Sequence, residues 1–478
     1  MSSSSAPAAQ SAREWSNYQQ AIFQEVAKGT GHAVVVARAG SGKTTTIMEA
    51  AKNLPAGSRV LMVAFNKAIE RDLATAAPRG VEVRTLHSFG RQTLAGVFGR
   101  VQLSPDKVPN LIREMLGHVS ADERAALCRG VELAKATLAT SAKDVLSLVE
   151  SFDISVPEEE EEDFATTVLA LLDACAKQPQ IVDFDDMIWL PVHLRVRPPR
   201  FDYIFIDETQ DLNRAQINLS LRACAPSGRI CAVGDDRQAI YSWRGADARA
   251  VPRLIDRLQA KVLPLSVSYR CARSIVTLAR EIVPDYEAAP NAEEGRVEAA
   301  NEDTLRREAA PGDFILSRTN APLVNLCLSF LAEGRPATIA GRDIGKGLEA
   351  LIRRSGARTV YELREWIDTW AEREEARLLR RGLDASDPKD RAECVWRLAD
   401  GARSVEDVLA KLERLFSDRA EGAQVTLSTT HKAKGLERKR AWVLQDTYRR
   451  GQSVEEDNLW YVAITRAQSD LRLVQKAA

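Results

Sequence analysis

A glycine-rich turn between a β-branched run and a helical pattern is the first place in this sequence where the residue types could bind phosphate. Residues 32–46 read HAVVVARAGSGKTTT. Glycines in such a turn let backbone N–H groups converge on phosphate oxygens, and the following helix N-terminus adds partial positive charge. Lys43 would reach the β- and γ-phosphates, and Thr44 would hold Mg²⁺. The candidate nucleotide-binding residues of the turn are Ala39, Gly40, Ser41, Gly42, Lys43, Thr44 and Thr45.

A second hydrophobic run, FDYIFIDETQD at 201–211, ends in two carboxylates. Ligands of open α/β sheets bind at the carboxyl ends of parallel strands. Asp207 would hold Mg²⁺ through water, and Glu208 would orient or deprotonate an attacking water. This pair can meet Lys43 only if much of the intervening chain is an insertion. Together the two motifs predict an enzyme that hydrolyses a nucleoside triphosphate.

A third segment, VGDDRQAIYSWRGA at 233–246, could connect the nucleotide to a nucleic acid. It begins as a buried strand and then offers Gln238, a neutral group able to sense a phosphate or a water. Tyr241, Trp243 and Arg244 follow within a few residues. A flat ring beside a cation is what an unpaired base would stack on.

Two arginines far along the chain could supply positive charge during phosphoryl transfer. Tyr269-Arg270 stands in SYRC just after an expected strand, and Arg466 ends the amphipathic helix EEDNLWYVAITRA at 455–467. Such an arginine neutralises charge on the γ-phosphate oxygens and raises the rate by roughly 10³–10⁵. If both belong to a second domain, the triphosphate lies at a domain interface and pulls it closed.

The elements that must position these residues form two zones of short β-branched runs alternating with helical patterns, which predicts an α/β protein with two parallel-sheet domains. Each zone is interrupted by a helix-rich segment poor in strand signals. The expected strands of the first zone are 32–38, 59–65, 81–86, 202–207 and 229–235. Those of the second zone are 263–268, 313–318, 337–340, 425–428, 440–445 and 469–474.

Composition favours a cytoplasmic multidomain protein. The 478 residues include 66 Lys+Arg and 67 Asp+Glu, so a nucleic-acid partner would need a local basic surface. The seven scattered cysteines suggest reduced thiols rather than disulfides or a metal site. No apolar run reaches membrane-spanning length, and residues 1–14 have the character of a disordered tail rather than a signal peptide.

Taken in order, these motifs resemble superfamily 1 DNA helicases of the UvrD/Rep/PcrA kind, and the resemblance runs from residue 15 to 474. The shared segments are SNYQQAI (16–22), the phosphate turn, VAFNKAI (63–69), TLHSFG (85–90), DETQD (207–211), VGDDRQAIYSWRGA (233–246), SYRC (268–271), TTHKAKGLE (429–437) and YVAITRA (461–467). So many motifs in the family's order are not a coincidence.

The resemblance implies roles for individual residues. Gln19 is expected to read adenine, Tyr269 to stack on it, and Glu437 to bind the ribose, with Gly435 in the same segment. Gln238, Arg270 and Arg466 would contact the γ-phosphate of ATP, beside Mg²⁺. The single-stranded DNA track is expected to include Phe65, Asn66, Lys67, His87, Tyr241, Trp243, Arg244, Arg318 and His431.

The resemblance also implies two RecA-like domains with a helical insertion in each. The first domain, 1A, is expected at 15–96 and 181–262, with insertion 1B at 97–180. The second, 2A, is expected at 263–347 and 423–478, with a short 2B-like insertion at 348–422. The implied activity is an ATP-driven motor on single-stranded DNA, moving 3′→5′.

Some positions depart from the family pattern. Ala37 replaces the usual first glycine of the phosphate turn, and Ala64-Phe65 precede Asn66-Lys67 where better-known members have Phe-Thr, as in short phage-type members and the helicase part of F-box DNA helicases. The short 2B-like insertion puts any role of a full 2B domain in doubt. No nuclease constellation is expected after residue 467.

Three alternatives remain open from the sequence. The protein could be an ATP-gated single-strand clamp or displacement factor, or the motor subunit of a larger repair or anti-phage complex with its helical insertions as docking surfaces. It could also be a small-molecule kinase with a phosphate loop, whose phosphorylation would not depend on nucleic acid.

Overall fold

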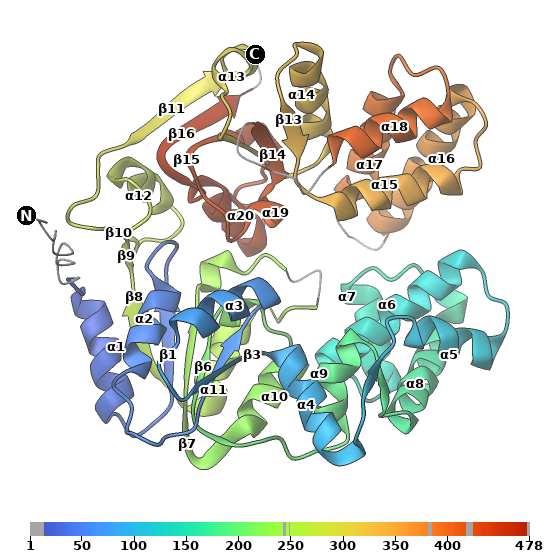
Figure 1. Ribbon diagram of the computed structural model, residues 1–478. Coiled ribbons are helices and arrows are strands. Elements are labelled where there is room, and N and C mark those ends of the chain that lie inside the picture. Colours follow the sequence, from blue (N-terminus) through green and yellow to red (C-terminus); the bar gives the residue numbers. More distant parts are fainter. Residues whose placement is uncertain (1–13, 242–244, 248, 381–384, 417–423, 476–478) are drawn as a thin grey trace, which may run out of the picture.

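The computed structural model describes residues 14–241, 245–247, 249–380, 385–416 and 424–475. Two six-stranded parallel sheets dominate it, and each carries a group of helices on the same side of the molecule (Figure 1). This confirms the predicted α/β class with two RecA-like parallel sheets. Within the described residues, no helix combines the length and the apolar character that crossing a membrane requires. We call the parts built on the two sheets the first and second lobes.

The first sheet has the strand order β3-β2-β6-β7-β1-β8, with every pairing parallel. Side chains of its buried strands alternate between two apolar cores, because helices cover both faces: Val34 packs into one core and Val35 into the other. The strands are β1 (Ala33–Ala37), β2 (Val60–Ala64), β3 (Val81–Thr85), β6 (Phe201–Ile206), β7 (Cys224–Gly234) and β8 (Lys261–Leu265). The helices are α1 (Asn17–Lys28), α2 (Lys43–Ala51), α3 (Lys67–Ala76), α4 (Leu86–Phe98), α9 (Phe184–His193), α10 (Arg214–Ala223) and α11 (Ala250–Leu258).

The strand expected at 263–268 in the second zone was assigned to the wrong sheet. β8 pairs with β1, up to Ala37 opposite Leu265, and only β9 (Val267–Ser268) lies beyond it, paired with β10 (Glu287–Ala288). Leu265 of this strand is completely buried in the core of the first lobe. The chain therefore leaves the first sheet beside the phosphate loop, where Arg38 N–H donates to Leu265 O at 3.0 Å.

The second sheet has the order β11-β16-β15-β12-β14-β13 and is also parallel throughout. The edge strand β11 was not predicted from the sequence, because Arg296–Asn301 is largely exposed and lacks an apolar run. The strands are β11 (Arg296–Asn301), β12 (Phe314–Ser317), β13 (Ala337–Ile339), β14 (Val425–Thr429), β15 (Arg438–Leu444) and β16 (Ala467–Gln475). The helices are α12 (Arg273–Ala279), α13 (Glu302–Glu308), α14 (Ala321–Ala332), α19 (Thr430–Ala433) and α20 (Val454–Ile464).

Two helical insertions extend from the same side of the lobes. The core of the first also contains Leu94 and Trp189, which lie outside the expected range 97–180. The second begins at Arg342, before the expected start at 348, because its first helix continues through two glycines. The first insertion contains α5 (Lys107–Leu116), α6 (Ala121–Thr137), α7 (Ala142–Ser151), α8 (Glu161–Lys177) and the β4–β5 pair (Gln102–Leu103, Ile181–Val182). The second contains α15 (Arg342–Arg354), α16 (Val360–Arg380), α17 (Ser386–Ala399) and α18 (Val405–Leu415).

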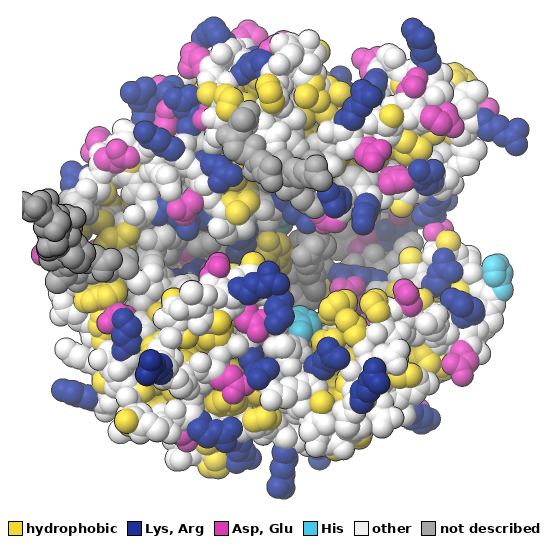
Figure 2. Space-filling model, in the orientation of Figure 1, with side chains coloured by type: hydrophobic (Ala, Val, Ile, Leu, Met, Phe, Trp, Pro, Cys, Tyr) yellow, Lys and Arg dark blue, Asp and Glu magenta, His cyan; other side chains and the backbone are white. Residues whose placement is uncertain are grey.

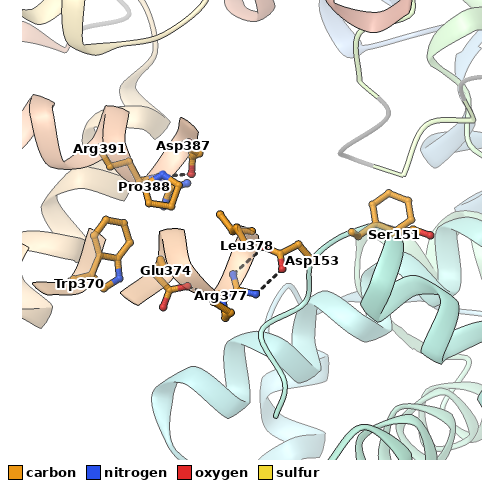
Figure 3. A pocket seen from close by; sticks show the side chains of 10 residues that line it. Ser151, Asp153, Trp370, Glu374, Arg377, Leu378, Asp387, Pro388 and Arg391 are labelled. Atoms are coloured by element: carbon orange, nitrogen blue, oxygen red, sulfur yellow. Dashed lines mark hydrogen bonds and ion pairs between the residues drawn. The ribbon is translucent and has the colours of Figure 1, made fainter. Parts of the chain in front are cut away.

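The two insertions touch each other. Arg377 of α16 donates to both carboxylate oxygens of Asp153, with the longer bond at 2.8 Å, and a cavity of about 390 Å³ lies beside this pair (Figure 3). Trp370 lines the same cavity. The insertions therefore form one of the contacts between the two lobes. The space-filling view shows a hollow between the insertions with Lys and Arg side chains on both sides of it (Figure 2).

Candidate active site

The predicted phosphate loop lies between β1 and α2, at the carboxyl edge of the first sheet. Gly40 and Gly42 have φ of +68° and +77°, a backbone conformation that residues with a Cβ rarely adopt. No side chain of the described residues caps the start of α2. The first N–H groups of any α-helix have no partner within the helix. Because no described side chain caps α2, its first N–H groups are available to an anion. The hydroxyl of Ser41, in the same turn, is buried and has no hydrogen-bond partner within the described chain.

The two carboxylates that follow β6 meet the phosphate loop as the sequence predicted. Lys43 Nζ lies 2.9 Å from Glu208 Oε2, and the Thr44 hydroxyl donates to Asp207 Oδ2 at 2.7 Å. Glu208 has φ of +50°, an unusual value for a residue with a side chain. Such backbone outliers cluster at functional sites, where the surrounding structure holds them.

The hydroxyl of Thr44 and the carboxylate of Asp207 fit a Mg²⁺ site, because Mg²⁺ prefers hard oxygen ligands and needs only one or two carboxylates beside substrate phosphates. No group of three or more His, Cys, Asp or Glu in the described residues could hold a metal by itself. Burial raises the pKa of Asp207 to about 6, and the neighbouring Glu208 carboxylate adds to the shift. A cation at this position would favour the ionised form of Asp207.

Glu208 remains ionised in this arrangement. Burial alone would raise its pKa, but the positive charges of Lys43 and Lys434 and a hydrogen bond from Gln210 lower the pKa of Glu208 to about 2. The ionised oxygens of Glu208 can accept hydrogen bonds from a water beside the phosphate loop. Burial would likewise lower the pKa of Lys43, yet the nearby carboxylates raise it, so this amine is charged.

Gln238 is buried between the two lobes. Its Nε2 donates to Asp235 Oδ2 at 2.6 Å, and its backbone carbonyl accepts from Lys434 Nζ at 2.7 Å. Lys434 also donates to both carboxylate oxygens of Asp211, at 2.6 and 2.7 Å, and lies 4.8 Å from the ring centroid of Tyr241. This lysine of the second lobe thus bridges the segments after β6 and β7. Lys434 was not predicted as a site residue from the sequence, although it belongs to the motif TTHKAKGLE (429–437).

The two candidate arginines lie together beside the phosphate loop. A Cβ added to Gly40 would come within 2.4 Å of Arg270 Cβ. Arg270 forms an ion pair with Glu437, the residue expected to bind the ribose, and Gly435 precedes it with φ of +83°. Arg466 is 1% exposed, and burial, with the nearby charge of Arg270, lowers its pKa to about 10. Arg270 of the second lobe thus lies directly against the loop, with Arg466 close enough for their charges to interact.

The residues expected to bind adenine are also brought together. Gln19 is buried on α1; its Nε2 donates to the Thr46 hydroxyl at 3.0 Å, and its Oε1 accepts from the Tyr269 hydroxyl at 3.3 Å. Tyr269 is 43% exposed, so much of its side chain remains accessible to a ligand. Thr45 lies in the first turn of α2, directly before Thr46.

Three residues expected on the DNA track line one large cavity. Tyr241, Arg318 and His431 surround a volume of about 960 Å³ between the second lobe and helices α15 and α17. The Tyr241 hydroxyl donates to His431 O at 2.8 Å. The Arg318 guanidinium is paired with Glu456 at 2.9 Å, so part of its charge is already compensated.

The remaining track candidates lie on the first lobe, after β2 and β3. Phe65 is 41% exposed, Asn66 caps α3 by accepting from Ile69 N–H, and Lys67 pairs with Glu70. The His87 ring lies 6.4 Å from that of Phe184, an exposed aromatic that sequence analysis did not select. Trp243 and Arg244 lie outside the described residues.

Comparisons with known proteins agree with this geometry. A family model described as the UvrD/Rep helicase N-terminal domain matches residues 17–259, and one described as the UvrD-like helicase C-terminal domain matches residues 424–474. The ATP-dependent DNA helicase Rep of Escherichia coli is 27% identical over 325 residues, covering 60% of this chain and 47% of Rep. The ATP-dependent DNA helicase PcrA of Staphylococcus epidermidis is 35% identical over 113 residues, covering 22% of this chain and 16% of PcrA. The chain thus spans about half the length of Rep, and less of PcrA.

Proposed function

The chain belongs to the UvrD/Rep helicase family, and on that premise we propose that it is an ATP-dependent motor that moves 3′→5′ along single-stranded DNA and separates duplex strands. The observation that carries the proposal is the packing of the phosphate loop against Arg270 of the second lobe. A triphosphate bound there would contact both lobes. Its hydrolysis would therefore change how the lobes pack.

Within this cleft each side chain has a distinct task. Lys43 and the start of α2 bind the phosphates, and Glu208 orients the attacking water. Arg270 and Arg466 neutralise the charge that develops on the γ-phosphate oxygens. Mg²⁺, held by Thr44 and Asp207, would neutralise further phosphate charge.

The strand is proposed to run over Phe65, Lys67 and His87 of the first lobe. It continues along the cavity between Tyr241 of the first lobe and His431 of the second. Closure and opening of the ATP cleft then shift one lobe along the strand relative to the other. Each base-pair step costs on the order of 1.4 kcal/mol to open. That load is modest for a step driven by one nucleotide.

Strand displacement on tailed duplexes tests this proposal. With ATP and Mg²⁺ we expect displacement of a duplex that carries a 3′ single-stranded tail and little displacement of the 5′-tailed duplex. Displacement of the 5′-tailed duplex alone would overturn the polarity. Translocation without displacement would instead identify an ATP-gated single-strand factor, and activity only with added partner proteins would identify a subunit of a complex.

Replacing Gln19 by alanine is expected to raise the KM for ATP by roughly 5- to 150-fold and to reduce discrimination against GTP. An amide that pairs with the adenine edge contributes about 1–3 kcal/mol of discrimination. Steady-state hydrolysis of ATP and GTP measures both effects.

Ser16→Ala is the matched control for this variant. Ser16 and Gln19 form the capping box of α1, so both substitutions disturb the same cap. Ser16→Ala should lower thermal stability without changing base preference. Equal KM values for the two variants would mean that Gln19 only caps the helix.

Phe65→Ala is expected to weaken single-stranded DNA binding by roughly 1–3 kcal/mol, because one base would lose its stacking platform. Fluorescence anisotropy with an oligonucleotide measures the change, and its salt dependence should stay the same since no phosphate contact is removed. Tyr361, an exposed aromatic on α16 outside the proposed track, provides the control substitution Tyr361→Ala. Unchanged affinity of Phe65→Ala would remove Phe65 from the track.

A further inference from the structure

Two tyrosines of the second lobe hold one residue of the phosphate loop at both of its backbone polar groups. Ala39 N–H donates to the Tyr461 hydroxyl at 2.9 Å, and Ala39 C=O accepts from the Tyr286 hydroxyl at 2.8 Å. Both rings are fully buried and pack edge to face, with centroids 5.8 Å apart. Ala39 itself packs into the apolar core of the second lobe. The loop is thus bonded to the lobe opposite its own sheet.

The hydroxyl of Tyr461 also contacts Asp235, and no such contact is made by the hydroxyl of Tyr286. The Tyr461 hydroxyl lies 3.3 Å from Asp235 Oδ2, the same carboxylate oxygen that accepts from Gln238 Nε2. A phenol donates one hydrogen bond, so Tyr461 accepts from Ala39 and donates to Asp235. Tyr286 instead meets the Ser268 hydroxyl at 3.0 Å.

A continuous path of hydrogen bonds therefore runs from the phosphate loop to the segment that leads to the DNA track. It passes from Ala39 through Tyr461 to Asp235 and on to Gln238. Asp235 is fully buried and has Arg38 at 3.4 Å on its other oxygen. A buried carboxylate is stabilised by its hydrogen-bond donors. Loss of one donor to Asp235 would therefore change the positions of the remaining donors. Tyr461 lies on α20, the helix that leads to Arg466.

We propose that Tyr461 is a positioning residue whose hydroxyl couples the phosphate loop to Asp235 and Gln238, so that DNA bound beyond Gln238 accelerates ATP hydrolysis through it. This inference rests on the proposed function, since it assigns the route by which DNA stimulates the ATPase. Tyr286 holds the same loop residue but has no bond to Asp235, so it contributes to the clamp alone.

Tyr461→Phe removes the hydroxyl and keeps the ring, and Tyr286→Phe makes the same change on the neighbouring ring. In the 478-residue chain, we expect Tyr461→Phe to lower the ratio of DNA-stimulated to unstimulated kcat by about tenfold or more, the effect of losing a hydrogen bond to a charged group. The KM for ATP should change by less than about twofold, because Tyr286 still holds Ala39 at its carbonyl. Tyr286→Phe should preserve the stimulation ratio.

Equal loss of stimulation in both variants would overturn the proposal, because the two rings would then act only as a clamp. A wild-type ratio of DNA-stimulated to unstimulated kcat in Tyr461→Phe would also overturn the proposal. Tyr448→Phe, which removes a buried hydroxyl bonded to Thr430, controls for general loss of stability.

Amide hydrogen exchange separates a failure of this inference from a failure of the proposed function. If the wild-type protein hydrolyses ATP without responding to DNA, the proposed motor function fails. Adding a non-hydrolysable ATP analogue should still protect the backbone of residues 235–238 in the wild type and in Tyr286→Phe. Loss of that protection in Tyr461→Phe alone supports the coupling role, and equal protection in all three proteins refutes it.

Discussion

Replacing Arg466 by alanine is expected to lower the kcat of DNA-stimulated ATP hydrolysis by roughly 10³- to 10⁵-fold, the contribution of an arginine that neutralises γ-phosphate charge. The hydrogen bonds of Arg466 go to the carbonyls of Val462 and Leu436 and to the Thr465 hydroxyl. No carboxylate in the described part of the chain pairs with it. Its lowered pKa of about 10 still leaves it charged at neutral pH. A buried cation without a counter-ion is costly, and a bound triphosphate would remove that cost.

Steady-state kinetics together with binding of a fluorescent ATP analogue would measure this effect. We expect kcat to collapse with a much smaller change in nucleotide affinity, because the contact strengthens in the transition state. The kcat of Arg466→Lys should lie between those of the wild type and Arg466→Ala. A lysine ammonium keeps the positive charge but lacks the planar guanidinium that can form two parallel hydrogen bonds.

Two controls separate this role from a structural one. Arg472 on β16 pairs with Asp470 and Glu298 on the far strands of the second sheet, so Arg472→Ala should hydrolyse ATP normally. Thermal melting and DNA binding of Arg466→Ala show whether the loss of its backbone contacts unfolds the protein. A folded Arg466→Ala variant with kcat within about tenfold of the wild type would contradict the role assigned to this arginine.

Replacing Lys43 by alanine is expected to reduce ATP hydrolysis by on the order of 10³-fold while leaving DNA binding largely intact. Lys43 is the closest cation to the carboxylates of Asp207 and Glu208, and its charge counters theirs where a triphosphate would bind. Without it, two negative groups would repel the incoming phosphates. The loss should therefore appear in both kcat and nucleotide affinity.

Lys52→Ala is the matched control for Lys43→Ala. Lys52 stands at the other end of α2, where it is exposed and paired with Glu49. Its removal should leave ATP hydrolysis unchanged, because a surface ion pair contributes little. Normal turnover in Lys43→Ala would refute the phosphate-loop assignment, and loss of DNA binding in the same variant would show that the substitution disturbs the fold.

The fold class and the local geometry of the candidate phosphate site could be predicted because their signals are local. The strand–turn–helix pattern around Lys43 specifies its own geometry, since glycines supply the positive φ and the helix start follows directly. The hydrophobic run before Asp207 likewise predicts where its carboxylate emerges from the sheet.

The sheet to which a strand belongs was harder to predict. Leu263 and Leu265 form a strand that would fit either lobe by its pattern, and only pairing with β1 assigns it to the first. The edge strand at Arg296 went unpredicted for a related reason: an exposed edge needs no apolar run. Register and pairing are decided by contacts between segments far apart in the chain.

By itself, the sequence determined the two-sheet architecture, the phosphate loop and the identity of most charged groups around it, because each depends on residues adjacent in the chain. Only the tertiary structure decided which groups meet across the cleft. It brought Lys434 onto Asp211, Arg270 against Gly40, and Tyr461 between Ala39 and Asp235. These contacts join segments of separate lobes, and their geometry exists only once both sheets have folded and packed together.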